Sequence, residues 1–221
     1  MKVGEDDLQT VDFNLTDMKF ILGVKKNMTQ VFDDTGKVIP VTVVEAGPVV
    51  VTQIKTKEVD GYDAVQIGFG EKKEKNLSKA LKGHFKGNGN FRHVKEFRVV
   101  DPSKLTLKVG DKIDLSTFKD GDDVCVSSIS KGKGFQGVIK RHGFKGQPRS
   151  HGQKHCERAP GSIGGGLRNK VPVGMRMAGR MGTDRITVKG LKVVQIDSAN
   201  NELLISGAVA GRRGTLLEIV G

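Results

Sequence analysis

Short runs of β-branched and other apolar residues make up most of the chain outside one central segment. The first four are KFILG, VIPVTVVEAG, VVVTQIKT and AVQIGFG, at residues 19–23, 38–47, 49–56 and 64–70, with DDTG and VDGYD between them. Aspartate and glycine at such places favour tight turns, and runs of this length and composition favour strands. The pattern predicts an antiparallel meander rather than alternating strands and helices.

One stretch, NLSKALKGHFK, has the periodicity of a helix. Apolar residues recur in it at i, i+4 and i+8, and Asn76 stands before them as a suitable N-cap. We expect a short amphipathic helix over residues 76–86, with Leu77, Leu81 and Phe85 on one face.

Further strands follow on both sides of a glycine-rich, basic segment at residues 131–182. An alternating stretch covers residues 91–100, two strands are expected within 108–130, and residues 185–197 and 201–209 form a hairpin across SANN. Because strands flank the basic segment, we expect it to leave a mainly β, antiparallel barrel and to return to it, with neighbouring strands holding its two ends.

Charge separates this segment from the rest of the chain. Residues 131–182 hold 12 of the 37 Lys and Arg but a single acidic residue, Glu157, whereas the rest has 25 basic and 24 acidic residues. The segment also holds 13 of the 30 glycines, and its only aromatic residues are Phe135 and Phe144. Such a composition cannot form its own core, so an anionic partner is expected to order it. A solvated flexible loop is the alternative.

The stretch SKGKGFQG contains a formal G-x-G-x-x-G at Gly132, Gly134 and Gly137. In a dinucleotide-binding fold, a helix follows such glycines, and an acidic residue about 20 positions on ends a second strand. Glu157 has the right spacing but lies in HCERAPG, and VIKRHGFKGQPRSHGQKH lacks the apolar stripe of a helix. A dinucleotide-binding enzyme is therefore the alternative function, and a polyanion accounts better for the lysines beside the glycines.

Other chemistry has little support in the sequence. His151, His155 and Cys156 would share one side only in a helix, which Gly152 disfavours. No nucleophile elbow or phosphate-binding P-loop motif is present, so we expect no enzyme, no cofactor and no metal. The chain has two cysteines in unlike contexts, which suggests that both are reduced. Its first residues are acidic, and it has no apolar run long enough to span a membrane. We therefore expect a soluble cytoplasmic protein.

Nucleic acid is the partner that remains. One tyrosine and no tryptophan leave few platforms for stacking single-stranded bases, and no basic recognition helix is evident. A long, glycine-rich basic strand fits the crevices of folded RNA. The residues expected to bind it are Lys131, Lys133, Gly134, Lys140, Arg141, His142, Lys145, Arg149, His151, Lys154, His155, Arg158, Arg168, Lys170, Arg176 and Arg180.

Several long motifs, from Met18 to about Ile219, resemble the bacterial form of the large ribosomal subunit protein three family. They include MKFILGVKKNMTQVFDDTGKVIPVTVVEAGPVVVTQIKT, SKGKGFQGVIKRHGF, RAPGSIG, RMAGRMG and NELLISGAVAG. The resemblance implies a barrel like the second domain of translation factors, direct binding of large-subunit rRNA early in assembly, and contacts with ribosomal proteins fourteen and nineteen. It also implies a loop that runs toward the peptidyl transferase centre.

The resemblance also suggests how the chain is divided. We expect residues 1–17 to be a peripheral extension, residues 18–130 with 183–221 to be the barrel domain with a helical insertion around 71–98, and residues 131–182 to be the extended loop. The loop tip near the peptidyl transferase centre is then Gly165, Gly166, Leu167, Arg168, Asn169 and Lys170.

Two positions depart from the family pattern. Asn27 stands where relatives commonly have glycine, which suggests a changed local turn. Some relatives carry a methylated glutamine after GSIG, but GGLRNK at residues 165–170 has none, so this modification is not expected.

Overall fold

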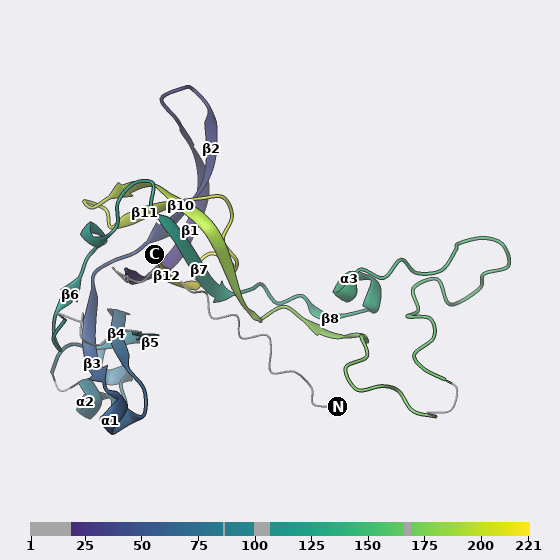
Figure 1. Ribbon diagram of the computed structural model, residues 1–221, viewed down its shortest axis with the longest axis horizontal. Helices are drawn as coiled ribbons and strands as arrows, with labels where there is room; N and C mark the ends of the chain where they lie inside the picture. Colours follow the sequence, from purple (N-terminus) through teal and green to yellow (C-terminus); the bar gives the residue numbers. More distant parts are fainter. Residues whose placement is uncertain (1–18, 86, 100–106, 166–168) are drawn as a thin grey trace. The chain divides into compact units, whose positions relative to one another are not determined.

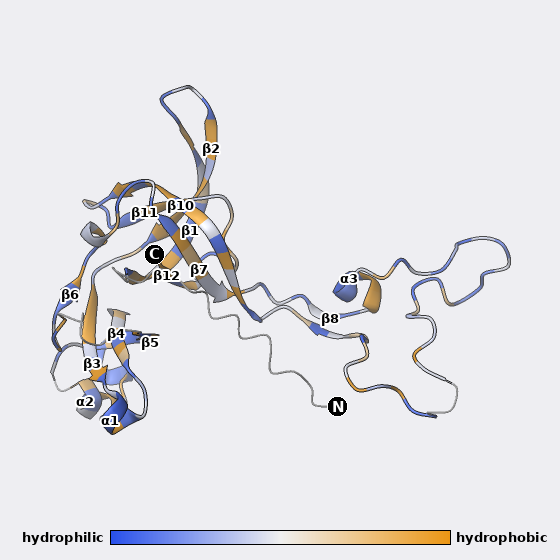
Figure 2. Ribbon diagram, viewed as in Figure 1, coloured by the Kyte–Doolittle hydropathy of each residue, from blue (hydrophilic) through white to orange (hydrophobic). Residues whose placement is uncertain are grey.

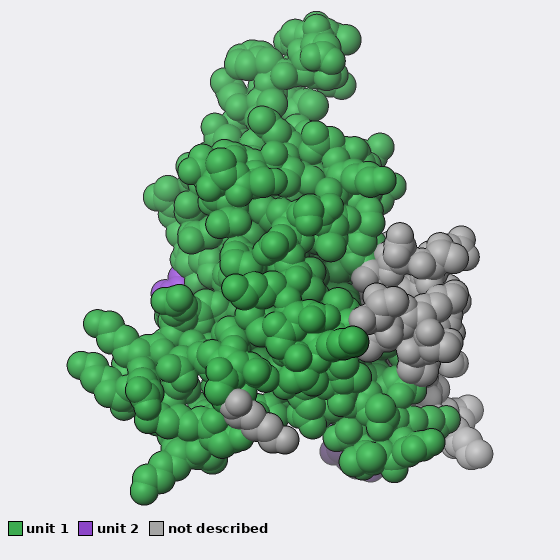
Figure 3. All heavy atoms as spheres, turned by 90° about the vertical axis from the view of Figure 1, so that its left-hand side faces the viewer, with its two compact units in different colours: residues 1–128, 187–209, 213–221 green, residues 129–186, 210–212 purple. Residues whose placement is uncertain are grey.

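The computed structural model describes residues 19–85, 87–99, 107–165 and 169–221. The chain forms two compact units (Figure 3). Unit 1 takes the described residues up to 128 together with 187–209 and 213–221, and unit 2 takes 129–186 and 210–212.

Six strands of unit 1 close into the expected antiparallel barrel. Their order around the barrel is β1, β12, β7, β10, β11, β2 (Figure 1). Closure pairs strands from the two ends of the chain, so none of the six is an edge strand of the barrel. The strands are β1 (Phe20–Phe32), β2 (Val38–Glu45), β7 (Asp123–Ile129), β10 (Arg185–Asp197), β11 (Glu202–Ser206) and β12 (Leu216–Val220).

A second sheet in unit 1 has the order β5, β4, β3, β6. Its strands are β3 (Val49–Lys55), β4 (Ala64–Glu71), β5 (Phe91–Arg98) and β6 (Lys112–Ile113). Short helices connect them: α1 (Lys57–Asp60), the 3-10 helix η1 (Glu74–Asn76), α2 (Lys79–Phe85) and the 3-10 helix η3 (Leu115–Thr117).

One apolar core joins the barrel to the second sheet. Leu22, Leu203 and Ile219 of the barrel and Ile67 of β4 are fully buried and belong to the same cluster. The ring of Phe20 in β1 stacks on Phe97 of β5, with 4.9 Å between ring centroids. Figure 2 shows apolar positions concentrated on the strands of this unit. The β-branched runs form strands because the barrel and the second sheet both bury their apolar side chains in this core.

The meander predicted from the strand pattern is incomplete. The hairpins β1–β2 and β10–β11 pair neighbours in sequence, but β12 lies between β1 and β7.

Asn27 is not in a turn: it lies inside β1, next to a bulge where the pairing with β2 shifts between Lys25 and Asn27. Asn27 does not have a positive φ at this bulge, so glycine is not needed there.

The predicted helix begins later than its sequence suggested. Asn76 ends η1, and α2 starts at Lys79, where the Oγ of Ser78 accepts the backbone N–H of Leu81 at 3.3 Å. Ser78 therefore serves as the cap that the sequence assigned to Asn76. Phe85 is buried as expected, whereas Leu81 is 39% exposed.

Candidate nucleic-acid interface

The basic segment connects two strands that lie side by side in the barrel, β7 and β10. At its base, the N–H of Ser130 donates to the carbonyl of Asp184 (2.9 Å), and the N–H of Asp184 donates to the Oγ of Ser130 (3.2 Å). The segment is thus closed at its start by a reciprocal pair of hydrogen bonds.

A short antiparallel ribbon continues this stem. β8 (Gly134–Gln136) pairs with β9 (Gly179–Met181), and Phe135 lies opposite Arg180. The N–H of Lys133 adds a hydrogen bond of 2.9 Å to the carbonyl of Met181. The loop is therefore less irregular than its composition predicted, because paired backbone groups stabilise it where apolar burial cannot.

A five-residue helix, α3 (Val138–His142), follows the ribbon and ends at Gly143 in the left-handed conformation. Arg141 donates from Nη1 to the carbonyl of Met177 (2.8 Å), and the ring Nε2 of His142 lies 3.1 Å from the same oxygen. A Cβ on Gly179 would come within 2.5 Å of Arg141 Nη1. Arg141 and His142 therefore hold the returning strand, in addition to the RNA contact predicted for them.

The single acidic residue of the basic segment shapes a further turn. Glu157 accepts a hydrogen bond from Arg149 Nε (2.6 Å), and its carbonyl accepts the N–H of Gln147 (2.8 Å). This carboxylate raises the pKa of the Arg149 guanidinium above its ordinary value. A Cβ on Gly146 would lie 2.7 Å from the carbonyl oxygen of Glu157. Glu157 thus joins two parts of the loop, whereas a dinucleotide-binding fold would need an acidic residue at this spacing to end a second strand.

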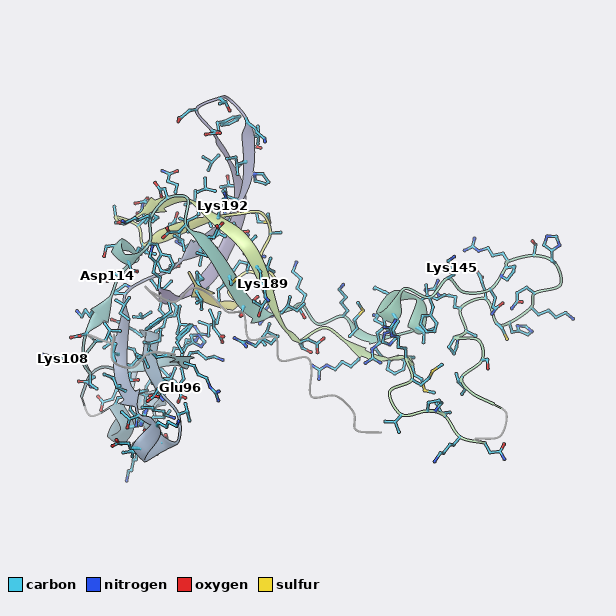
Figure 4. All side chains as sticks on the ribbon, viewed as in Figure 1. Glu96, Lys108, Asp114, Lys145, Lys189 and Lys192 are labelled. Atoms are coloured by element: carbon cyan, nitrogen blue, oxygen red, sulfur yellow. The ribbon has the colours of Figure 1, made fainter. Side chains whose placement is uncertain are left out.

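Most of the predicted RNA-binding cations point into solvent. Figure 4 labels one of them, Lys145, on the loop. Within the described residues, nine are exposed and form no ion pair: Lys131, Lys133, Lys140, Lys145, Lys154, Arg158, Lys170, Arg176 and Arg180. His151 and His155 are exposed as well. A cation without an internal partner keeps its charge available for phosphate.

The predicted loop tip is described only in part, because Gly166, Leu167 and Arg168 lie outside the described residues. Gly165, Asn169 and Lys170 are exposed, and Asn169 has a φ of 44°. Asparagine tolerates this left-handed conformation better than most residues.

The glycines of SKGKGFQG do not form a dinucleotide-binding turn. The expectation that no helix follows them was wrong, since Gly137 is the N-cap residue of α3. The preceding strand, β8, is however paired antiparallel with β9, so Gly134 and Gly137 border a ribbon rather than a βαβ crossover. Gly134 has a φ of 68°, and a Cβ there would meet no other atom within 4 Å.

The described residues contain no group of three or more His, Cys, Asp or Glu that could hold a metal ion. Cys125 is buried and Cys156 is exposed, and both are free thiols. Among the described helices, none has the length and apolar character needed to cross a bilayer.

A second basic region is not evident from the total charge outside the loop. Residues 71–98 contain nine Lys or Arg and three Glu, and the chain outside both basic regions has 16 basic and 21 acidic residues. The near balance of charge outside the loop is therefore the sum of this basic region and an acidic remainder. A charge sum over a short window would have found it.

Comparison with known proteins gives consistent matches. The family described as "Ribosomal protein L3" matches residues 104–213. A Finegoldia magna protein is 48% identical over 204 residues, covering 91% of this chain and 97% of its own. A Roseiflexus protein is 53% identical over 201 residues, covering 90% and 95%, and a Herpetosiphon aurantiacus protein is 48% identical over 201 residues, covering 90% and 94%. Each is named "Large ribosomal subunit protein uL3". With identity this high over nine-tenths of the chain, the barrel and its basic loop belong to the Ribosomal protein L3 family.

Proposed function

We propose that this chain is a structural constituent of the bacterial large ribosomal subunit and that residues 131–182 bind its rRNA directly. The observation that carries the proposal is the set of nine exposed, unpaired cations on a segment with one buried apolar side chain, Val138. These counts refer to the described part of the loop.

The physical basis of binding is electrostatic. Each phosphate that a cation neutralises releases condensed counterions, which favours binding strongly at low salt. The stem hydrogen bonds at Ser130 and the ion pair of Glu157 restrict the free loop, so less conformational entropy is lost when RNA orders it.

Family resemblance supports the finer parts of the proposal. The loop extends through large-subunit rRNA toward the peptidyl transferase centre, with Gly165, Asn169 and Lys170 near its tip. The protein binds early in assembly and contacts ribosomal proteins fourteen and nineteen. Its place of action is the ribosome in the cytoplasm.

The role at the peptidyl transferase centre is structural. Asn169 carries no titratable group, and no acid or histidine accompanies Lys170 in the described part of the tip. A general base needs such a partner to work near neutral pH. The loop therefore orders rRNA around the centre and does not take part in bond making.

Sedimentation tests this proposal. A tagged chain should travel with the large subunit in a high-salt sucrose gradient, and ultraviolet crosslinking should join it to large-subunit rRNA. A tagged chain that stays at the top of the gradient and retains or titrates NAD would contradict the proposal and support a dinucleotide-binding enzyme.

A further inference from the structure

We propose that unit 1 carries a second RNA-binding surface, centred on α2, that takes the phosphate backbone of large-subunit rRNA. The inference rests on the proposed function and extends it beyond the loop. We call this region the α2 surface, and its members are Lys73, Lys75, Lys79, Lys82, Gly83 and Arg92.

The cations of the α2 surface come from three segments that the structure brings together. Lys82 of α2 forms an ion pair with Glu74 of η1 (2.8 Å), which joins the helix to the turn that carries Lys73 and Lys75. The N–H of Lys72 donates to the carbonyl of Asn90 (2.9 Å), which places the same turn beside the start of β5.

The remaining positive charges on this surface have no internal counterion. Lys73, Lys75, Lys79 and Arg92 are exposed and form no ion pair with any residue that the structure describes. Glu74 offsets only one charge, and its pKa is lowered by the hydrogen bond from Lys82. The surface therefore keeps a net positive charge and attracts an anionic partner.

Packing fixes α2 on the sheet before any partner binds. Phe85 is 1% exposed and meets Phe91 edge to face, with 5.4 Å between ring centroids. The ring Nε2 of His84 donates to Oε1 of Gln66 at 2.6 Å, and Gln66 is buried on β4. Cβ atoms on Gly68 or Gly89 would collide with the Phe91 ring. A surface held this firmly loses little conformational freedom on binding.

Gly83 is the feature that points to a close-fitting partner. It lies inside α2, where glycine is a poor helix former, and a Cβ there would meet no atom within 4 Å. Packing within the described protein therefore gives no reason for a glycine. Lys79 stands four residues before Gly83, so the bare backbone lies on the same helix face as the Lys79 side chain. Glycine at such a place lets a phosphate approach the backbone closely.

RNA fits this surface better than an acidic protein does. Protein interfaces centre on buried apolar and aromatic anchors. Within the described part of residues 71–98, Leu81 is the single large apolar side chain that is markedly exposed, at 39%. Lysines around a glycine supply charge and close approach without such an anchor, which suits a phosphate backbone.

Substitutions in the otherwise intact chain test the inference, with large-subunit rRNA transcribed in vitro as the probe. Gly83→Ala and Gly83→Leu should raise the melting temperature of the free protein, because both residues favour helix. Gly83→Leu should nevertheless weaken RNA binding by about tenfold, since its side chain holds the phosphates away. Gly83→Ala should also weaken RNA binding, but by less than Gly83→Leu.

Charge removal gives a second readout. Lys79→Ala combined with Arg92→Ala should reduce the slope of log affinity against log salt by about 1.5, the value for two lost phosphate contacts. The matched control is Lys57→Ala on α1, where Glu58, Asp60 and Asp63 are close in sequence. This control should leave RNA binding unchanged.

Three results would overturn the inference in distinguishable ways. Native RNA affinity in Gly83→Leu, or a native salt slope in the double variant, would show that α2 does not contact rRNA. Native affinity of the α2 variants for rRNA, together with lost incorporation into subunits, would assign the surface to a protein partner.

A loop variant with Lys131, Lys133 and Lys140 changed to alanine separates the two proposals. If the salt dependence of RNA binding falls in this variant but not in the α2 variants, only the α2 surface fails. If the native chain itself has a flat salt response, the proposed function fails.

Discussion

The barrel and the loop of this chain reach a defined shape by different means. In the barrel, side chains such as Leu203 and Ile219 are fully excluded from water, and their burial drives folding. In residues 129–186, Val138 is the one buried apolar residue among those described, and hydrogen bonds, an ion pair and glycines set the path of the chain. A segment that must present its cations to a partner cannot also bury them, so its own stability is low.

The α2 surface combines both solutions. Its cations face solvent like those of the loop, but Phe85 and Phe91 anchor it to the sheet. We therefore expect one chain to make both preformed and partner-ordered RNA contacts, and we expect the two kinds to respond differently to mutation.

The largest contrast should appear on truncating side chains. Leu203→Ala removes a fully buried side chain of the barrel, and we expect the free energy of unfolding to fall by about 3 kcal/mol in urea titrations. Val173→Ala in the loop, where the side chain is completely exposed, should change it by less than about 0.5 kcal/mol. Similar losses from both would mean that the loop belongs to the folded core.

The next contrast concerns the stem of the loop. Gly182 has a φ of 80°, and a Cβ there would collide with the backbone of Lys131. Gly182→Ala should therefore open the ribbon, expose the N–H of Lys133 to hydrogen exchange, and weaken RNA binding by about tenfold. The free energy of unfolding of the barrel should not change.

Gly174→Ala is the matched control for this effect. Gly174 has a φ of 82° but no atom within 4 Å of a built Cβ, so it isolates the cost of the backbone conformation. Equal effects of the two substitutions would show that the clash at Lys131 is unimportant.

A smaller effect is expected at Gly134, the first residue of β8. Gly134 has a φ of 68° in open space, so Gly134→Val should cost about 1–2 kcal/mol in local backbone energy and weaken RNA binding several-fold. Lys133→Ala removes one surface charge and should weaken binding less. Equal, small losses in a filter-binding assay would indicate a merely flexible turn.

The smallest expected effect is a pH dependence in unit 1. The hydrogen bond from Lys55, followed by that from Tyr62, lowers the pKa of Glu96 on β5. A carboxyl with a lowered folded-state pKa adds stability above its unfolded pKa, and this is lost as pH falls through the folded value. Glu96→Gln should therefore cost under about 1 kcal/mol near neutral pH. The difference from the native chain should shrink as pH falls below the ordinary glutamate pKa and vanish below the lowered folded-state pKa. A difference that persists in acid would assign the effect to packing.

Local patterns predicted the parts of this fold that depend on local chemistry. The strands and the turn at DDTG follow from β-branched runs and from turn residues, and Gly36 there has a φ of 78° as such a turn requires. The order of strands around the barrel could not be read in this way, because β1 pairs with β12 from the far end of the chain. The start of α2 was missed because Asn76 and Ser78 are both good caps.

The candidate site divides along the same line. Charge and glycine content identified the loop and predicted which of its Lys and Arg residues would be available to RNA. They could not reveal that Arg141 reaches Met177, 36 residues away, or that β8 pairs with β9, because neither contact leaves a periodic pattern in the sequence. The α2 surface escaped notice because its charge was averaged with the acidic remainder of unit 1.

The central claim is that the loop supplies most of the electrostatic binding to rRNA, and salt dependence measures this directly. If about six phosphates are neutralised, log affinity of the native chain for large-subunit rRNA should fall with log salt at a slope of about −4 to −5. Replacing residues 131–182 by a short turn between β7 and β10 should reduce the slope to about −1 to −2 while circular dichroism still shows a folded barrel. A flat response of the native chain, or a slope that survives the replacement in a folded protein, would contradict the account.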